Sequence, residues 1–174
     1  MYCFFILSVL FLTGCGDNGS VANTSRVILS TQGSLPVGAA LSGVDVTLQL
    51  PTGITPRLAA DGTVDISVVK GSGVITGKAG IFTVTYTPAS GTLPGTLNFV
   101  IYSTAVDGFG IGEFATVTMN KAAHEVDFAA VGQNMAAGTT LLVSTDYKVK
   151  SFSPRDLAGS IVNTINIALA VEAN

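Results

Sequence analysis

The sequence predicts an all-β protein built as a single antiparallel β-sandwich of about nine strands. Only 11% of the residues are charged, whereas long helices normally need many Glu, Lys and Arg residues. Apolar residues recur at every second position in several separate runs, which is the period of a half-buried strand. Turn residues separate these runs by about 10 to 18 positions, a spacing that favours an antiparallel sandwich over a parallel α/β sheet.

The predicted strands follow from this alternation, taken in chain order. In the first clear run, Val44, Val46 and Leu48 face one way and Asp45 and Thr47 face the other. The clearest runs are 44–50, 64–68, 82–86, 97–102, 115–119 and 165–171, and weaker ones are 26–31, 140–144 and 147–152. Breakers such as Pro51-Thr52-Gly53, Asp61-Gly62, Gly71-Ser72-Gly73, Pro94-Gly95 and Asp107-Gly108 lie between them. Segment 121–136 stays undecided, because 124–131 fits either a strand or a short helical turn.

The chain starts with an apolar run over residues 4–12, followed by Leu12-Thr13-Gly14-Cys15. The run suits the apolar region of a secretory signal and is too short to cross a bilayer, which needs about twenty residues. The quartet resembles the lipobox of bacterial lipoproteins, although Met1-Tyr2 carries no Lys or Arg. The alternative is an N-terminal apolar strand with an incidental cysteine.

The lipobox resemblance implies a processed and lipid-anchored product. It implies cleavage between Gly14 and Cys15, a diacylglyceryl group on the Cys15 thiol and an acyl chain on the new amine. Residues 1–14 would be the signal peptide, 15–25 a polar flexible tether and 26–174 the sandwich domain. Gly16, and not Asp, follows the cysteine, which by the same resemblance favours the outer membrane or cell surface.

Cysteine content and net charge argue against a disulfide-bonded or thiolate-metal protein and against a nucleic-acid-binding protein. Cys3 and Cys15 both lie at or before the expected cleavage point, so the mature chain has neither a disulfide nor a thiolate metal ligand. A net charge of −3 gives no electrostatic case for a nucleic-acid partner or an anionic lipid surface.

The strand pattern resembles the cohesin family, within a wider group of immunoglobulin-like and jelly-roll sandwiches that includes carbohydrate-binding modules. The residues that carry the resemblance are 27–29, 44–51, 53–54, 97–101 and 112–118. Cohesins bind dockerin modules through a sheet face and have no catalytic residues. The resemblance therefore implies a non-enzymatic protein-binding or structural module with a dockerin-like partner, and the alternative is a polysaccharide-binding module. No binding residue matches individually.

The sequence offers few candidate sites. Gly108, Gly110 and Gly112 flank Phe109 and Ile111, which we expect to project from a turn as an apolar contact patch. No metal site is expected, because Asp61, Asp65, Asp107 and Asp127 lack the spacing of a calcium loop.

The remaining chemically active residues suggest no catalytic constellation. His124 beside Glu125 and Asp127 fits an exposed polar loop. Gly71-Ser72-Gly73 lacks the strand–helix context of a nucleophile elbow. We expect Tyr86 and Tyr102 to pack in the core, and Lys148, Lys150 and Arg155 to form a solvated strand face. No enzyme activity and no cofactor beyond the Cys15 lipid are predicted.

Overall fold

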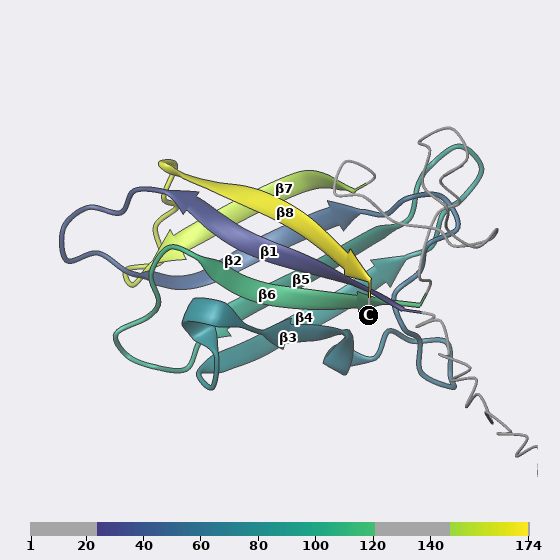
Figure 1. Cartoon of the computed structure of the whole chain (residues 1–174), viewed down its shortest axis with the longest axis horizontal. Helices are drawn as coiled ribbons and strands as arrows, with labels where there is room; N and C mark the ends of the chain where they lie inside the picture. The colour runs from purple at the N-terminus through teal and green to yellow at the C-terminus, as the bar shows by residue number, and fades with distance from the viewer. Residues whose placement is uncertain (1–23, 121–146, 174) are drawn as a thin grey trace, which may run out of the picture.

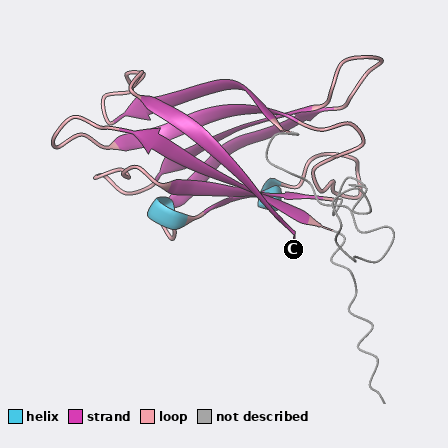
Figure 2. Ribbon diagram, turned by 45° about the horizontal axis from the view of Figure 1, so that its top comes forward, coloured by secondary structure: helices cyan, strands magenta, loops and turns pink. Residues whose placement is uncertain are grey.

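A computed structural model describes residues 24–120 and 147–173 of the chain. In these residues, two four-stranded antiparallel sheets stack face to face, so the predicted β-sandwich is confirmed (Figures 1 and 2). The described part contains eight strands, where the sequence suggested about nine. The predicted strand 140–144 and the undecided segment 121–136 lie outside the described residues.

The first sheet has the order β3-β6-β1-β8. Its strands are β3 (Val69–Gly71), β6 (Glu113–Met119), β1 (Ser25–Gly33) and β8 (Ile165–Ala173). β1 pairs along its whole length with β8 and over most of it with β6. The strands expected at 26–31, 115–119 and 165–171 are therefore confirmed.

The second sheet has the order β4-β5-β2-β7. Its strands are β4 (Ala79–Thr87), β5 (Thr96–Ser103), β2 (Leu41–Gln49) and β7 (Lys148–Asp156). β2 lies between β5 and β7 and pairs antiparallel with both. The predictions at 44–50, 97–102 and 147–152 are confirmed to within a few residues.

The core lies between the two sheets and follows the alternation seen in the sequence. Val44, Val46 and Leu48 are fully buried, whereas Asp45 and Thr47 on the other face of β2 are half-buried. The largest fully buried side chains are Phe99 of β5 and Phe114 of β6, which come from opposite sheets. Burial of such aromatic rings contributes a large share of the stability of a sandwich.

The strand predicted at 64–68 is wrong. Val64 makes only an isolated bridge, and Ile66–Val68 forms a short 3-10 helix, η1. The Asp65 carboxylate accepts a hydrogen bond from the Ser67 N–H at 2.8 Å, which caps the first turn of this helix. Asp favours such local bonds over a strand ladder, so the alternation here does not lead to sheet pairing.

The strand predicted at 82–86 is present as part of β4, but the prediction that Phe82 faces the core is wrong. Phe82 is 78% exposed, whereas Val84 packs against the core. The register between β4 and β5 shifts between Ile81 and Thr83, and an extra residue at such a bulge turns its side chain outward. Ile81 therefore takes the inward position expected for Phe82.

Strand pairing determines which loops share an end of the sandwich. Ser25, at the start of β1, pairs with Met119 and Ala173, so the first described strand begins where the last one ends (Figure 1). The opposite end carries four connections, which we call the distal loops. They are residues 34–40, 72–78, 104–112 and 157–164.

Candidate interaction surface

The distal loops are joined to one another by hydrogen bonds. Lys78 donates from Nζ to the Gly108 carbonyl at 2.9 Å, and its own carbonyl accepts from the Thr104 N–H at 2.7 Å. Thr164 donates from Oγ1 to the Ser34 carbonyl at 2.9 Å. These bonds link 72–78 to 104–112 and 157–164 to 34–40, so neighbouring distal loops support each other.

A buried threonine fixes the end of the 104–112 loop. The Thr31 hydroxyl accepts from the Gly112 N–H at 3.0 Å and donates to the Gly112 carbonyl at 3.1 Å. The Thr31 backbone N–H donates to the same carbonyl at 2.8 Å. Gly112 is thus held against β1 just before β6 begins.

The predicted contact patch of Phe109 and Ile111 is wrong at Phe109. This side chain is only 3% exposed and belongs to the core cluster. The reason is a backbone bridge between Phe109 and Leu41, the first residue of β2. The two residues exchange N–H···O bonds of 2.8 and 2.9 Å, which hold Phe109 next to β2. Ile111 is half-buried.

Other apolar side chains of the distal loops are exposed instead. Val106 is 97% exposed and Val37 is fully exposed, while Leu157 and Ile161 are each about half exposed. Val37 precedes Gly38 and Val106 lies just before Asp107-Gly108, so both occupy turn tips. In both places a single valine lies next to turn-forming residues, and this sequence pattern could have identified the exposed valines. These four exposed apolar side chains come from three of the distal loops, at one end of the sandwich.

An exposed aromatic lies on the outer face of the second sheet. Tyr102 is 40% exposed, so the expectation that it packs in the core is wrong. It pairs with Gly80 of β4 and with Gly43 of β2, and its ring covers the position where Gly80 would carry a side chain. Tyr86 is half-buried against the core, as predicted, and this burial raises its pKa.

Asp61 and Asp65, two of the four aspartates considered as calcium ligands, accept hydrogen bonds within local turns. Asp61 Oδ1 accepts from the Thr63 hydroxyl at 2.6 Å and from the Thr63 N–H at 3.0 Å, and these bonds lower the pKa of Asp61. The bond from the Ser67 N–H lowers the pKa of Asp65 in the same way. Within the described residues, no group of three potential metal ligands comes together.

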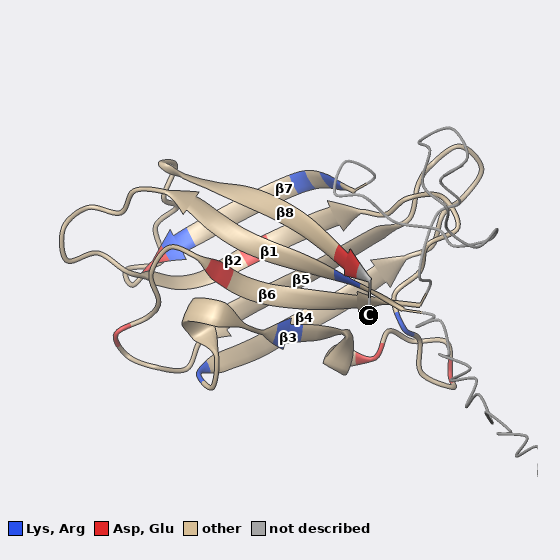
Figure 3. Cartoon of the chain, viewed as in Figure 1, with Lys and Arg blue, Asp and Glu red and all other residues tan. Residues whose placement is uncertain are grey.

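The other residues singled out from the sequence do not converge. Ser72 precedes a single 3-10 turn, η2 (Gly73–Ile75), and not the helix of a nucleophile elbow. Lys148, Lys150 and Arg155 are exposed along β7, as predicted (Figure 3). The residues Gly14, Cys15, His124, Glu125 and Asp127 lie outside the described part.

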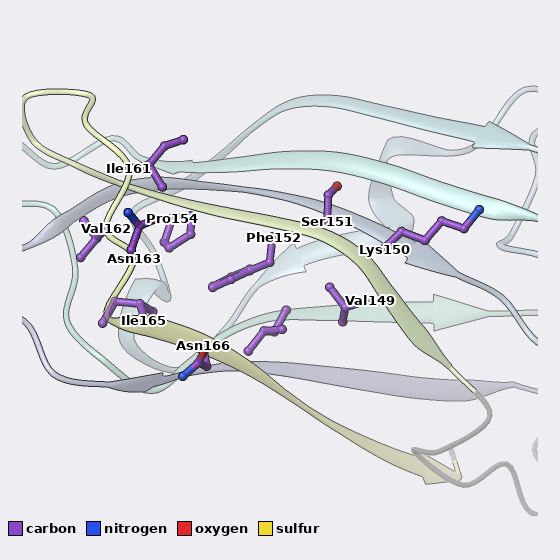
Figure 4. A pocket seen from close by; sticks show the side chains of 11 residues that line it. Val149, Lys150, Ser151, Phe152, Pro154, Ile161, Val162, Asn163, Ile165 and Asn166 are labelled. Atoms are coloured by element: carbon purple, nitrogen blue, oxygen red, sulfur yellow. The ribbon is translucent and has the colours of Figure 1, made fainter.

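A groove of about 440 Å³ runs between β7 and β8, where the two sheets do not close over each other. In Figure 4, Val149 and Phe152 extend from β7 toward β8, while Ser151 and Lys150 point to the other side of β7. Ile165 and Ile167 of β8 also line the groove, together with Asn163 and Asn166, so its walls are part apolar and part polar.

No helix in the described part is long and apolar enough to cross a membrane. Comparison with protein-family models, with curated proteins and with solved structures found no match for the chain.

Proposed function

We propose that this chain is an exported, lipid-anchored and non-enzymatic β-sandwich that works as an interaction or structural module at the bacterial outer membrane or cell surface. The observation that carries the proposal is the Leu12-Thr13-Gly14-Cys15 quartet directly after the apolar run 4–12. In this account Cys15 carries the lipid, and several acyl chains on one residue hold a protein firmly to a membrane, at about 0.8 kcal/mol per buried CH₂.

The arrangement of the strands supports this role. β1 begins at Ser25, so residues 15–24 would connect the lipid to the sandwich, with a reach of at most about 35 Å when extended. The distal loops lie at the end of the sandwich away from Ser25. The lipid would therefore hold one end, and the exposed apolar side chains at the other end would face a partner. Confinement to a surface raises the effective concentration of such a contact.

The anchoring half of the proposal is tested with the chain's own two cysteines. We expect Cys15→Ser to abolish incorporation of a clickable fatty acid and to release the protein from the membrane fraction. Cys3→Ser is the matched control, because Cys3 lies within the signal peptide, and it should leave both properties unchanged. Equal labelling of the two variants would contradict the proposal.

The interaction half is tested at the distal loops. A photo-reactive amino acid at Val106 or Val37 should crosslink in intact cells to one partner of discrete mass, and the same probe at Thr85, an exposed residue of β4, should not. Replacing Leu157 and Ile161 by Ser should weaken the crosslink. A band that appears equally from Thr85, or that survives the double replacement, would contradict a contact at these loops.

Carbohydrate binding is the second candidate, and the exposed Tyr102 favours it. Flat aromatic side chains stack on sugar rings, and Phe82 is a second exposed aromatic on the neighbouring strand β4. In this case the protein should be retarded in a polysaccharide gel, and Tyr102→Ala should abolish the retardation while Thr85→Ala does not. Migration that is unaffected by polysaccharide would exclude this candidate.

A further inference from the structure

Two of the four edge strands of the sandwich are poor templates for another chain. An edge strand exposes unpaired N–H and C=O groups, and proteins protect such edges by shortening, bending or charging them. β3 has only three residues. β4 is interrupted by the bulge at Phe82, which breaks the regular spacing of its backbone groups.

The edge of β7 is also protected. It carries Lys148 and Lys150, and Pro154 has no N–H to offer. Its distal part already pairs with the chain that follows, because the Asp156 N–H donates to the Ser160 carbonyl and the Val162 N–H to the Pro154 carbonyl, both at 2.9 Å.

The fourth edge, β8, has none of these features. It is nine residues long, contains no Lys, Arg or Pro, and pairs with β1 without a register shift. Its one charged residue, Glu172, already accepts a hydrogen bond from Arg26 of β1 at 2.6 Å. Within residues 24–120 and 147–173, no strand or isolated bridge pairs with the second edge of β8.

The inward face of β8 is also incompletely covered. Ile167, Leu169 and Val171 pack against the core but are only half-buried. Ile167 also lines the groove that separates β7 from β8. A strand added to the outer edge of β8 would bind the N–H and C=O groups of that edge. It would also cover the half-buried side chains of Ile167, Leu169 and Val171.

We propose that β8 pairs antiparallel with β8 of a second copy of this chain, which joins two four-stranded sheets into one sheet of eight strands. The strand is complementary to itself about Leu169. In this register Leu169 lies opposite its own counterpart, Ile167 opposite Val171, and Asn166 opposite Glu172. Apolar residues therefore meet apolar residues, and each carboxylate meets an amide that can donate to it, with no like charges opposed. Such a two-fold contact closes after two copies.

A cysteine on the two-fold axis tests the pairing in cells that express the full chain. Leu169→Cys should form a disulfide-linked dimer on mild oxidation, because directly opposed strand residues lie about 5 Å apart. Asn166→Cys is the matched control, since its counterpart would be about 20 Å away along the strand. The parent chain under the same oxidant shows any crosslinking through Cys3 or Cys15.

Two further variants keep the test decisive if Leu169→Cys disturbs the core. Ala170 is exposed on the outer face of β8, and Ala170→Cys should crosslink through a short bismaleimide, since the two copies of this residue would be about 7–8 Å apart. Ala170→Lys, introduced together with Leu169→Cys, should abolish the dimer through like-charge repulsion, whereas Thr85→Lys on β4 should not.

The outcomes separate this pairing from the proposed function. A dimer from Leu169→Cys and Ala170→Cys that Ala170→Lys abolishes supports it, whether or not Cys15 is acylated. Folded variants that stay monomeric would overturn it. Equal crosslinking from Asn166→Cys, or a crosslinked band at the mass of a different protein, would also overturn pairing with a second copy.

Discussion

The hydroxyl of Thr31 on β1 accepts a hydrogen bond from the Gly112 N–H at 3.0 Å and donates one to the Gly112 carbonyl at 3.1 Å. These two residues lie far apart in the sequence, and their pairing ties the last turn of the 104–112 loop to β1, one of the two central strands of the first sheet. One buried side chain thereby connects the core of the sandwich to the distal loops.

Thr31→Val tests this connection, because it keeps the shape of the side chain and removes both of its hydrogen bonds. We expect the free energy of unfolding to fall by about 1–3 kcal/mol, since the Gly112 N–H loses its partner. Chemical denaturation measures this change. Thr85→Val, at an exposed position of β4, is the control and should change stability by less than about 0.5 kcal/mol. Equal effects of the two variants would contradict the assigned role of Thr31.

Gly33→Ala and Gly38→Ala separate backbone strain from steric overlap. Both glycines have positive φ, +120° at Gly33 and +79° at Gly38, so an alanine strains either one by about 1–2 kcal/mol. A Cβ at Gly33 would also overlap the Thr164 carbonyl, whereas a Cβ at Gly38 meets open space. We expect Gly33→Ala to lower the melting temperature clearly more than Gly38→Ala. The reverse order would show that β1 does not end against residue 164 as described.

Phe82→Ala and Phe99→Ala compare the same chemical change at two strand positions. Phe99 is fully buried between the sheets, and its truncation should cost about 3–5 kcal/mol. Phe82 points outward at the bulge, and its truncation should change stability by less than about 0.5 kcal/mol. Unfolding in denaturant measures both. A large loss at Phe82 would mean that it faces the core, as strict alternation predicts.

The carboxylates of Asp61 and Asp65, which accept local hydrogen bonds, make stability depend on acid pH. Hydrogen bonds from Thr63 and Ser67 hold the pKa values of Asp61 and Asp65 below their ordinary value of 3.8. Their contribution is therefore present above the unfolded-state pKa and is lost as the pH falls through the lower folded-state pKa. We expect stability to decrease between about pH 5 and pH 2, and Asp61→Asn with Asp65→Asn to make that decrease shallower. An unchanged slope in the double variant would refute this origin.

The strands could be predicted from the sequence wherever alternation and burial agree. In β2, β5 and β6, every second residue is apolar and buried, so the period in the sequence matches the pleat of the sheet. Alternation alone was misleading at residues 64–68 and at Phe82. At the first site a local Asp65 cap stabilises a 3-10 turn, and at the second a bulge shifts the register. The cap is a local bond between Asp65 and Ser67, and the bulge depends on pairing with β5, and a period of two shows neither.

The candidate surface was harder to predict than the fold. A glycine-rich turn suggested that Phe109 projects, but its backbone bridge to Leu41 on β2 buries it. That bridge joins distant parts of the chain, and no local pattern shows it. Tyr102 follows the buried Ile101 on β5 and therefore faces outward, and glycines at the facing positions of both neighbouring strands leave room for its ring.

Acylation of the Cys15 sulfur is the claim on which the proposed function depends, and the mass of the N-terminal tryptic peptide measures it directly. The first Lys or Arg of the chain is Arg26, so this peptide reports on every residue before it. Our account predicts a peptide of residues 15–26 whose first residue carries a diacylglyceryl group and an amide-linked acyl chain. A peptide of residues 1–26 with unmodified thiols at Cys3 and Cys15 would contradict it.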